Sequence, residues 1–327
     1  MSTALVTGAT GFVGSNLVAA LADRGWRVRV LLRPTSSRAA LEGLAYEEFL
    51  GDVLDAESVA RAMAGVEWVF HVAAVAHYWR TSAAHMYRVN VEGTRIVMAA
   101  ALRAGVARVV HCSSCAALGV PERGRPADES HAFNIPPERF HYGHSKLLAE
   151  EEVQHAVAAG LPAVIVNPCV IIGPRDVNFI SGSLIKEALR GLLRVLPPGG
   201  MSIVHVDDVI AGHLAAAERG VPGERYILSG ENLTHWEVGR IVCRTVGVRP
   251  PLAIIPGIVL PAAAACASAF ERLAGPRLPI NSDQLRLSRE NMYYDGTKAR
   301  QAFGLNPKPA SVAIEDAYRW YREHGIL

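Results

Sequence analysis

The sequence predicts an α/β protein, in which a doubly wound parallel sheet is joined to a smaller, interleaved C-terminal unit. In the first half of the chain, short apolar runs alternate with helical stretches, and a glycine-rich turn joins the first run to the first helix. After Pro168 this alternation becomes irregular. Alternating strands and helices indicate a parallel sheet covered on both faces. The 327 residues, 50% of them apolar, suffice for a large core.

Each apolar run has the length and composition of a buried parallel strand. The predicted strands cover residues 3–6, 28–32, 68–72, 109–111 and 163–166, and the helices between them cover 13–23, 56–63, 84–103 and 145–159. In the second half we predict helices at 184–190, from Asp208 onward and at 314–323, a turn at 197–200, and a strand at 226–229 that rejoins the sheet. Thr234-His-Trp-Glu237 has the spacing of a capping box, which predicts a helix start.

Composition and charge argue against several kinds of partner. A formal charge of +2 gives no reason to expect nucleic acid or an acidic partner. No paired spacing of cysteine or histidine predicts a metal site. Cys112-Ser-Ser-Cys115 resembles a redox motif, but we interpret it as small residues where a buried strand ends. The N-terminus runs directly into a strand-like segment without a signal-like leader, so the expected location is the cytoplasm.

The stretch from Leu252 to Phe270 contains no charged residue, which raises the question of a membrane contact. Pro256 and Pro261 interrupt it, and its alanine run is only mildly hydrophobic, so we expect no membrane span. We interpret the stretch as a buried wall of the C-terminal unit that lines an apolar pocket. The alternative is a peripheral contact with a membrane surface.

The turn after the first strand has the spacing of a loop that binds a dinucleotide. Gly8 allows the tight turn, Gly11 lets the backbone approach a pyrophosphate, and Gly14 lets helix and strand pack closely. The N-terminus of the following helix then meets the negative charge. The residues between these glycines complete the predicted phosphate site; they are Thr10, Phe12 and Val13. The predicted sheet is therefore of the Rossmann type.

The end of the second strand favours NADP(H), with NAD(H) as the second choice. Some 20 residues after such a loop, a carboxylate usually binds the ribose 2′-hydroxyl of NAD. Here that strand ends with Arg33, followed by Ser36, Ser37 and Arg38, which could hold a 2′-phosphate instead. The alternative is a solvated basic loop.

The turn Gly51-Asp52-Val53 follows a further predicted strand, the third in chain order, and contains candidates for the adenine end of the cofactor. Asp52 and Val53 are placed to meet the adenine ring, although Asp52 could equally be an ordinary loop carboxylate.

Tyr142-Gly-His-Ser-Lys146 places a phenol and an ammonium one helical turn apart. A free tyrosine titrates near pH 10, so a nearby cation is needed before it can exchange protons at neutral pH. Ser114, upstream, would hydrogen-bond a reacting oxygen and orient it toward Tyr142. Tyrosine and lysine at this spacing alone would usually be a surface helix face, but the upstream glycine loop makes hydride transfer coupled to proton transfer the favoured interpretation.

These motifs together resemble the extended short-chain dehydrogenase/reductases, also called the NAD-dependent epimerase/dehydratase family. Within that family the chain looks closest to the dihydroflavonol-reductase-like branch, which includes hopanoid-associated sugar epimerases and relatives acting on 3β-hydroxysteroids. The resemblance covers essentially the whole chain. It is carried by residues 7–14, His71-Val-Ala-Ala74, Asn90-Val-Glu-Gly-Thr94, Ser113-Ser114, 142–146, Asn167-Pro168, Gly173-Pro174, His205-Val-Asp-Asp-Val209, 226–233, Asp295-Gly-Thr-Lys-Ala299 and Leu305-Asn-Pro-Lys-Pro309.

The resemblance implies a role for each matching residue. Tyr142 would be the acid/base, and Lys146 would bind the nicotinamide ribose and lower the pKa of the tyrosine. Ser114 is the serine that matches the family pattern, and Asn90 matches a position near the active site. The other implied cofactor contacts are Ala73 and Ala74, with Pro168 and Val170 flanking the nicotinamide. Asn167 stands where many members carry arginine.

The resemblance also implies a division of the chain. Residues 1–168, with about 203–229, would form the NADP-binding Rossmann domain. Residues from about 169 to 202 and from 230 to 327 would bind a small-molecule substrate. Members of the family are monomers or homodimers.

Three functions compete. The first is interconversion of a ketone and a secondary alcohol with exchangeable NADP(H), the second is nucleotide-sugar epimerisation with tightly held NAD, and the third is a non-catalytic nucleotide-sensing role. The presence of Tyr142 and Lys146 disfavours the third. Ala116 and Ala117 stand where sugar dehydratases carry acids, which disfavours dehydration.

We predict the first function, on a largely apolar, ring-containing substrate that is sterol-, terpenoid- or flavonoid-like. Tyr78 and Trp79 could stack on its rings, or they could simply pack in a loop. Arg175 and Arg194 could instead clamp the diphosphate of a nucleotide sugar, although surface placement is the commoner fate of such arginines.

Overall fold

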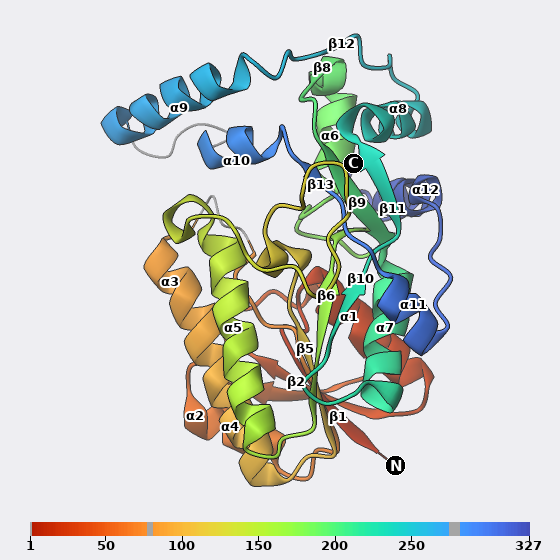
Figure 1. The fold of residues 1–327 in the computed structure, drawn as a ribbon. Coiled ribbons are helices and arrows are strands. Elements are labelled where there is room, and N and C mark those ends of the chain that lie inside the picture. The colour runs from red at the N-terminus through yellow and green to blue at the C-terminus, as the bar shows by residue number, and fades with distance from the viewer. Residues whose placement is uncertain (1, 77–80, 275–281) are drawn as a thin grey trace.

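The computed structural model describes residues 2–76, 81–274 and 282–327. At its centre is a seven-stranded, fully parallel sheet in the order β10-β6-β5-β4-β1-β2-β3 (Figure 1). Its strands are β1 (Thr3–Thr7), β2 (Arg27–Leu32), β3 (Glu47–Leu50), β4 (Trp68–His71), β5 (Arg108–Cys112), β6 (Ala163–Pro168) and β10 (Arg225–Leu228). The strand predicted at 226–229 therefore does rejoin the sheet, at its edge.

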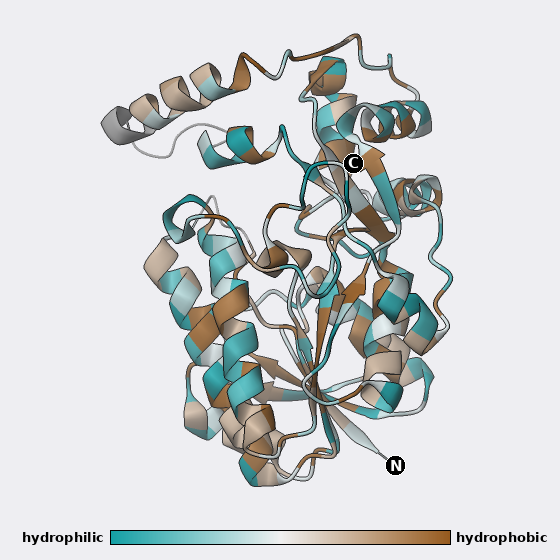
Figure 2. Ribbon diagram, viewed as in Figure 1, coloured by the Kyte–Doolittle hydropathy of each residue, from teal (hydrophilic) through white to brown (hydrophobic). Residues whose placement is uncertain are grey.

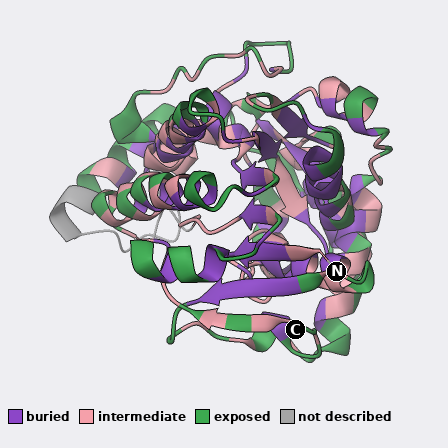
Figure 3. Ribbon diagram, turned by 90° about the horizontal axis from the view of Figure 1, so that it is seen from below, coloured by how far each residue is buried: buried purple, intermediate pink, exposed green. Residues whose placement is uncertain are grey.

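Helices cover both faces of this sheet, which confirms the doubly wound α/β prediction (Figure 1). One face packs against α1 (Phe12–Asp23), α7 (Val206–Arg219) and α11 (Thr297–Phe303). The other face packs against α2 (Ala56–Met63), α4 (Gly93–Ala104) and α5 (His141–Ala158). The buried side chains lie along the strands and the inward helix faces, as Figure 3 shows in purple.

A smaller unit, built mostly from the second half of the chain, lies beyond the carboxyl edge of the large sheet. Its sheet contains β7 (Val170–Ile172), β9 (Gly200–His205), β11 (Glu231–Thr234) and β13 (Asn291–Met292). The helices α6 (Ser183–Leu189), α8 (His235–Val246) and α12 (Ala310–Glu323) enclose a separate core. Thr234 caps α8 in a complete capping box with Glu237, as predicted.

Several short elements connect these units. They are α3 (Ala83–Tyr87), α9 (Leu260–Ala274), α10 (Ser282–Leu287), the paired strands β8 (Val195–Leu196) and β12 (Ala253–Ile254), the 3₁₀ turns η1 (Ala39–Leu41), η3 (Cys115–Leu118), η4 (Pro137–Arg139) and η5 (Leu192–Arg194), and the π-helical turn η2 (Arg88–Glu92). In the part of the chain that is described, no helix is both long and apolar enough to span a bilayer.

Three predicted elements differ from the structure. The helix predicted at 84–103 is divided by η2, a π-helical turn in which the backbone N–H of Gly93 donates to the carbonyl oxygen of Arg88, five residues earlier. The helix predicted from Ser145 begins at His141, which places Tyr142 and Lys146 on one continuous helix. The last helix begins at Ala310, directly after Pro309, rather than at Ile314.

The prediction of a buried wall between Leu252 and Phe270 is wrong. Leu252 is 70% exposed and Ile258 is 88% exposed, while helix α9, over residues 260–270, buries one stripe of side chains at Leu260, Ala264 and Ala267. These three are spaced by four and three residues, so they share one face of the helix. An apolar composition without charge does not by itself require burial.

Candidate active site

The glycine loop between β1 and α1 is shaped for close approach of a phosphate. Gly8 has a φ of 71°, and a Cβ at this position would lie 2.6 Å from the backbone nitrogen of Ala73. A Cβ on Gly14 would collide with the carbonyl oxygen of Gly8. The loop is therefore pressed against the start of α1 and the end of β4, where only glycine fits.

The N-terminus of α1 offers unpaired backbone donors to an anion. Gly11 is the N-cap residue, no side chain caps the helix, and its first turn contains no acid. The first N–H groups of a helix lack partners within the helix and carry the positive end of its dipole. Phe12 is buried beneath this turn, while Thr10 and Val13 stay half-buried at its surface. The residues present therefore fit the pyrophosphate of a dinucleotide.

Two arginines follow β2, and only one of them is tied to a carboxylate. Arg33 is exposed directly after the strand. Arg38 pairs with Glu48 on β3, from Nη2 to Oε1 at 2.8 Å, and also donates to the carbonyl oxygen of Ser36. This pairing raises the pKa of Arg38 and lowers the pKa of Glu48. Ser37 is exposed between the two arginines.

Asp52 stabilises a turn at the end of β3. Its Oδ1 accepts a hydrogen bond from the backbone N–H of Leu54 at 2.9 Å, which is the behaviour of an ordinary loop carboxylate. Val53 is buried, and a Cβ on Gly93 of α4 would lie 3.0 Å from its Cγ2, which is a tight contact.

Further candidate cofactor residues lie at the carboxyl ends of neighbouring strands. Ala73 and Ala74 follow β4, Pro168 ends β6, and Val170 begins β7. In an open parallel sheet, ligands bind at this edge.

Lys146 is buried within helix α5, and it points toward the end of β5. Only 2% of the residue is exposed, and its Nζ donates to the carbonyl oxygen of Cys112 at 2.7 Å. Burial lowers the pKa of Lys146. Tyr142 lies one turn earlier on the same helix and is half-buried. Gly143 between them lets α5 touch η3, because a Cβ there would lie 2.6 Å from the carbonyl oxygen of Ala116.

The structure distinguishes the two serines after β5. Ser113 is buried, and its hydroxyl donates to the carboxylate of Glu150. Ser114 is half-buried at the N-cap of η3, where its hydroxyl accepts from the backbone N–H of Ala116 at 3.2 Å. Ser114 therefore has the more accessible hydroxyl of the pair, next to the segment that α5 contacts through Gly143.

Asn90 is buried in η2 and binds two other segments. Its Oδ1 accepts from the N–H of Val75 at 2.7 Å, and its Nδ2 donates to the hydroxyl of Ser145 at 2.9 Å. Ser145 in turn donates to the carbonyl oxygen of Tyr142. Asn90 is 1% exposed, so these contacts describe a positioning residue that joins the loop after β4 to the Tyr142–Lys146 turn.

A second chain of hydrogen bonds runs beneath the glycine loop. The N–H of Ala73 donates to Thr7 Oγ1, which lies 2.8 Å from Nδ1 of His71, and Nε2 of His71 lies 3.0 Å from Thr94 Oγ1. Thr94 donates its hydroxyl proton to the carbonyl oxygen of Asn90. Each hydroxyl has one proton, so the chain assigns the His71 proton to Nε2. Burial lowers the pKa of His71 to about 3, and the ring is neutral.

Glu150 anchors a buried polar network behind Lys146. Asn167 donates to Glu150 Oε1 at 2.6 Å, and Arg225 Nη2 lies 3.1 Å from Glu150 Oε2. Asn167 also donates to the carbonyl oxygen of Ser114 at 3.0 Å, so the network positions the candidate catalytic serine. Burial raises the pKa of Glu150, and Arg225 opposes this shift. This role of Glu150 was not predicted. Its one signal in the sequence is its position one helical turn after Lys146, four residues further on.

Two cysteines meet beside the same serine. Cys115 Sγ lies 2.9 Å from Cys169 Sγ, and burial raises the pKa of Cys115 well above its usual value. Cys112 is buried separately, and burial raises its pKa to about 11. The cysteines of Cys112-Ser-Ser-Cys115 are thus small buried residues, as interpreted from the sequence.

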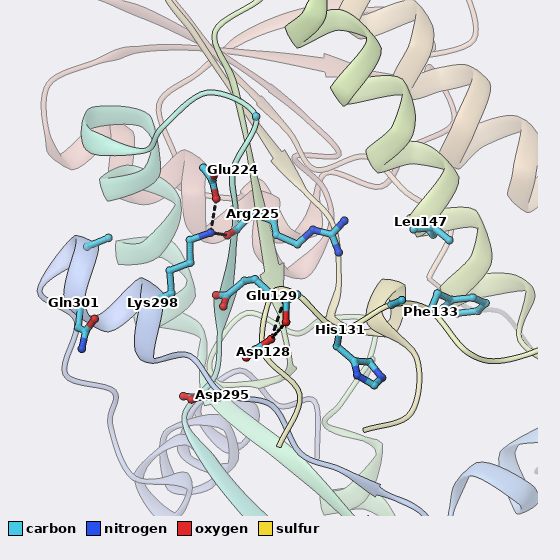
Figure 4. A pocket seen from close by; sticks show the side chains of 14 residues that line it. Asp128, Glu129, His131, Phe133, Leu147, Glu224, Arg225, Asp295, Lys298 and Gln301 are labelled. Carbon is cyan, nitrogen blue, oxygen red and sulfur yellow. Dashed lines mark hydrogen bonds and ion pairs between the residues drawn. The ribbon is translucent and has the colours of Figure 1, made fainter. Parts of the chain in front are cut away.

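A pocket outside this constellation lies at the β10 edge of the sheet (Figure 4). Four of its lining residues are carboxylates, and in Figure 4 the side chain of Arg225 extends away from them toward α5. Lys298 pairs with Glu224 at 2.5 Å. Ser114, Tyr142 and Lys146 do not line this pocket.

The remaining predicted substrate residues are not brought together. Tyr78 and Trp79 lie outside the described residues. Arg175 donates to the carbonyl oxygen of Ala40, whereas Arg194 donates to that of Pro250. These two arginines therefore contact different segments.

Comparison with known proteins identifies the family. Residues 4–229 match the model of the NAD dependent epimerase/dehydratase family. The chain is 37% identical, over 99% of its length and the whole of the relative, to a protein named sterol demethylase protein B from Methylococcus capsulatus. It is 32% identical, over 93% of its length and 85% of the relative, to a 3β-hydroxysteroid dehydrogenase/Δ5→4-isomerase from Mycobacterium tuberculosis.

Solved structures agree with this assignment. The crystal structure of gox2253 superimposes with a TM-score of 0.88 at 40% identity, over 99% of each chain. The structure of DesIV from Streptomyces venezuelae, a dTDP-glucose 4,6-dehydratase with NAD bound, has a TM-score of 0.78 at 25% identity, over 98% of this chain and 97% of that one. The chain therefore belongs to the NAD-dependent epimerase/dehydratase family and is an NAD(P)-dependent oxidoreductase of the extended short-chain dehydrogenase/reductase type.

Proposed function

We propose that the protein interconverts a ketone and a secondary alcohol on a largely apolar, ring-containing substrate, with NADP(H) as an exchangeable cofactor. The observation that carries this proposal is the packing of α5 against the end of β5. Lys146 bonds to Cys112, and Gly143 contacts Ala116, so the helix turn with Tyr142 abuts the segment that begins with Ser114.

Each of the three residues has a distinct task in this proposal. The nicotinamide, when bound, supplies or accepts the hydride. Ser114 hydrogen-bonds the reacting oxygen and orients it, and Tyr142 transfers the proton between its phenol and that oxygen. The ammonium of Lys146 stabilises the phenolate and holds a ribose hydroxyl. In this proposal Asn90 positions Tyr142 and Lys146 through Ser145, and Glu150 positions Ser114 through Asn167.

Arg33 supports NADP rather than NAD. It is exposed immediately after β2, where NAD-dependent Rossmann domains place an acidic residue that binds the 2′-hydroxyl. Arg38 is already paired with Glu48, so we assign the main contact with a 2′-phosphate to Arg33, and a smaller one to Ser37 and Arg38. In the same proposal, Asp52 and Val53 face the adenine, and Ala73, Ala74, Pro168 and Val170 border the rest of the cofactor.

The substrate class rests on the names of the relatives. Besides those named for sterols and steroids, one relative at 33% identity is named a ketoreductase of a farnesyl dihydroquinoline oxide, from Stigmatella aurantiaca. Another, at 30% identity, is named ceramide reductase, from Caulobacter vibrioides. Apolar substrates are common to these names. We assign residues 1–168, with about 203–229, to cofactor binding and the rest of the chain to the substrate.

Replacement of Tyr142 by Phe tests the chemistry. The assay follows oxidation of NADPH by purified protein with a panel of sterol-, terpenoid- and flavonoid-like ketones. Tyr142→Phe should lower kcat by on the order of 10²–10⁴-fold, because it removes the proton donor. Tyr318→Phe, on α12, is the matched control and should keep full activity. Full turnover by Tyr142→Phe would refute the proposed mechanism. Turnover of nucleotide sugars without added cofactor would favour an epimerase instead.

A further inference from the structure

Six large apolar side chains are exposed at the end of the molecule where β8, β12 and the start of α9 lie (Figure 1). Their exposed fractions run from 48% to 88%, and they are Leu192, Val195, Leu252, Ile254, Ile258 and Val259. Figure 2 shows this end as a largely brown, apolar rim. We call it the β8–β12 surface. Isolated exposed apolar residues are normal, but a contiguous group marks an interaction site.

Backbone pairing makes this group contiguous. Val195 lies opposite Ala253 in the β8–β12 pair, and the N–H of Leu252 donates to the carbonyl oxygen of Arg194 at 2.8 Å. The chain then passes through a turn in which the N–H of Val259 donates to the carbonyl oxygen of Pro256. The six side chains therefore come from two adjoining segments rather than from scattered positions.

The segments that carry this surface are also purely cationic. Residues 188–206 and 238–270 contain five arginines, Arg190, Arg194, Arg240, Arg244 and Arg249, and no aspartate or glutamate. The rest of the chain has 28 basic and 31 acidic residues, so the two signs of charge nearly balance there. Arg190 and Arg249 are exposed, and they stand two residues before Leu192 and three residues before Leu252 in the chain. The nearest acid before Arg190 is Glu187, whose pKa is raised by burial and lowered by Arg190.

We propose that the β8–β12 surface docks the protein on an anionic lipid bilayer. The six apolar side chains enter the interface between headgroups and acyl chains, and the arginines contact lipid phosphates. Apolar side chains beside a one-sign cationic rim are the two components of peripheral membrane binding. The proposal goes beyond the reaction and does not rest on it.

A second copy of this chain is a poorer occupant. In a two-fold dimer the same surface faces itself. Such an interface would bring Arg190 and Arg249 of the two copies close together, and like charges repel. An anionic membrane satisfies both the apolar and the cationic parts of the surface.

Docking would also place the active site near the membrane. In Figure 1, α9 and α10 continue from this surface and lie beyond the end of α5 at which that helix begins, which is the end that carries Tyr142. A protein bound through the β8–β12 surface could therefore meet substrates that partition into lipid.

Cosedimentation of the full chain with vesicles tests the proposal. Phosphatidylcholine vesicles containing phosphatidylglycerol should bind the protein at least about tenfold more tightly than phosphatidylcholine alone, and added salt should weaken the binding. Ile258→Asp should lower the affinity about tenfold or more. Val221→Asp is the control, because Val221 is also an exposed apolar residue but lies between α7 and β10, and this variant should bind like the wild type.

The charge component has its own variant. Arg190→Gln with Arg249→Gln should lower binding about 10–30-fold, while Arg103→Gln with Arg123→Gln, two exposed arginines elsewhere, should not. Failure of the wild type to bind the anionic vesicles would overturn the proposal. A dimer in solution that Ile258→Asp dissociates, with no vesicle binding, would overturn it in favour of a second copy. Because Ile258 is 88% exposed, Ile258→Asp should unfold at the same temperature as the wild type, so that a loss of vesicle binding reports on the surface and not on the fold.

Discussion

The buried ammonium of Lys146 donates to the backbone carbonyl oxygen of Cys112 at 2.7 Å. This bond joins the second turn of α5 to the last residue of β5, two residues before Ser114. It gives the Nζ of a lysine that is 2% exposed a hydrogen-bond acceptor, while burial lowers the pKa of that lysine. Burial of an ionisable group costs stability, so we expect Lys146 to serve the chemistry rather than the fold.

Lys146→Met should therefore separate stability from activity. We expect kcat/KM to fall about 10²–10³-fold, because a preorganised cation is lost. Burial lowers the pKa of Lys146 in the folded protein below the value of 10.5 expected in the unfolded chain. At a pH between the folded and the unfolded pKa, the unfolded chain therefore binds more protons than the folded protein. The unfolding free energy of the wild type, relative to Lys146→Met, should then rise with pH in this range.

Urea unfolding of both proteins at several alkaline pH values measures this difference, since the contributions of other groups largely cancel. A difference that falls with rising pH would contradict the depressed pKa. A Lys146→Met protein that is inactive because it is unfolded would show that the lysine is structural.

The two neighbouring serines should respond differently to replacement by alanine. Ser114→Ala should lower kcat on the order of 10²-fold with little change in stability, because its half-buried hydroxyl accepts a 3.2 Å hydrogen bond from the N–H of Ala116, a donor that water can also satisfy. Ser113→Ala should cost about 1–3 kcal/mol of unfolding free energy, since buried Glu150 loses a donor. Thermal unfolding and steady-state rates of both variants decide the assignment. The reverse pattern would make Ser113 the catalytic serine.

Arg33 should carry most of the preference for the phosphorylated cofactor. Arg33→Ala removes a charge-assisted contact and should raise the Kd for NADPH about 10–100-fold, while the Kd for NADH stays within about twofold. Arg38→Ala should have a smaller effect, because Glu48 already engages that guanidinium. Fluorescence titration of the wild type and of both variants with each nucleotide gives the six dissociation constants needed. Equal losses for NADPH and NADH would remove Arg33 from the 2′-phosphate site.

Asn90 and Ser145 should be energetically coupled. In a double-mutant cycle with Asn90→Ala and Ser145→Ala, the unfolding free energies should deviate from additivity by about 0.5–3 kcal/mol, because one side chain donates to the other. Asn90→Ala combined with Thr234→Ala, at the distant cap of α8, should be additive.

The same cycle tests whether Asn90 is a positioning residue. If it acts by holding the Tyr142–Lys146 turn, kcat should fall in the single variants and fall little further in the double variant. Independent, multiplicative losses in kcat would contradict this role.

The sequence predicted those parts of the site whose geometry is local. Gly8 to Gly14 lie within one turn and one helix start, and Tyr142 and Lys146 lie one helical turn apart, so spacing alone fixes their relationship. Most of the parallel sheet was equally predictable, because six of its strands are largely buried and appear as apolar runs. The edge strand β3 alternates exposed and half-buried residues and carries no such signal.

The contacts that position these residues could not be predicted in the same way. Glu150 meets Arg225, and Asn90 meets Ser145, across 75 and 55 residues of chain. Such pairs depend on how elements pack, which no local pattern encodes. The exposure of Leu252 and Ile258 was misjudged for a related reason: hydropathy states what a side chain prefers, and packing decides whether a partner is present.

The central claim is that this protein is a reductase that exchanges NADP(H) at each turnover. Its most direct test is a fluorescence titration of the purified protein with NADPH and with NADH, after any nucleotide carried through purification has been identified. The account predicts a protein that binds exchangeable NADPH more tightly than NADH and then oxidises it with a sterol-like ketone. Tightly retained NAD that does not exchange would contradict the account and make nucleotide sugars the substrates to test.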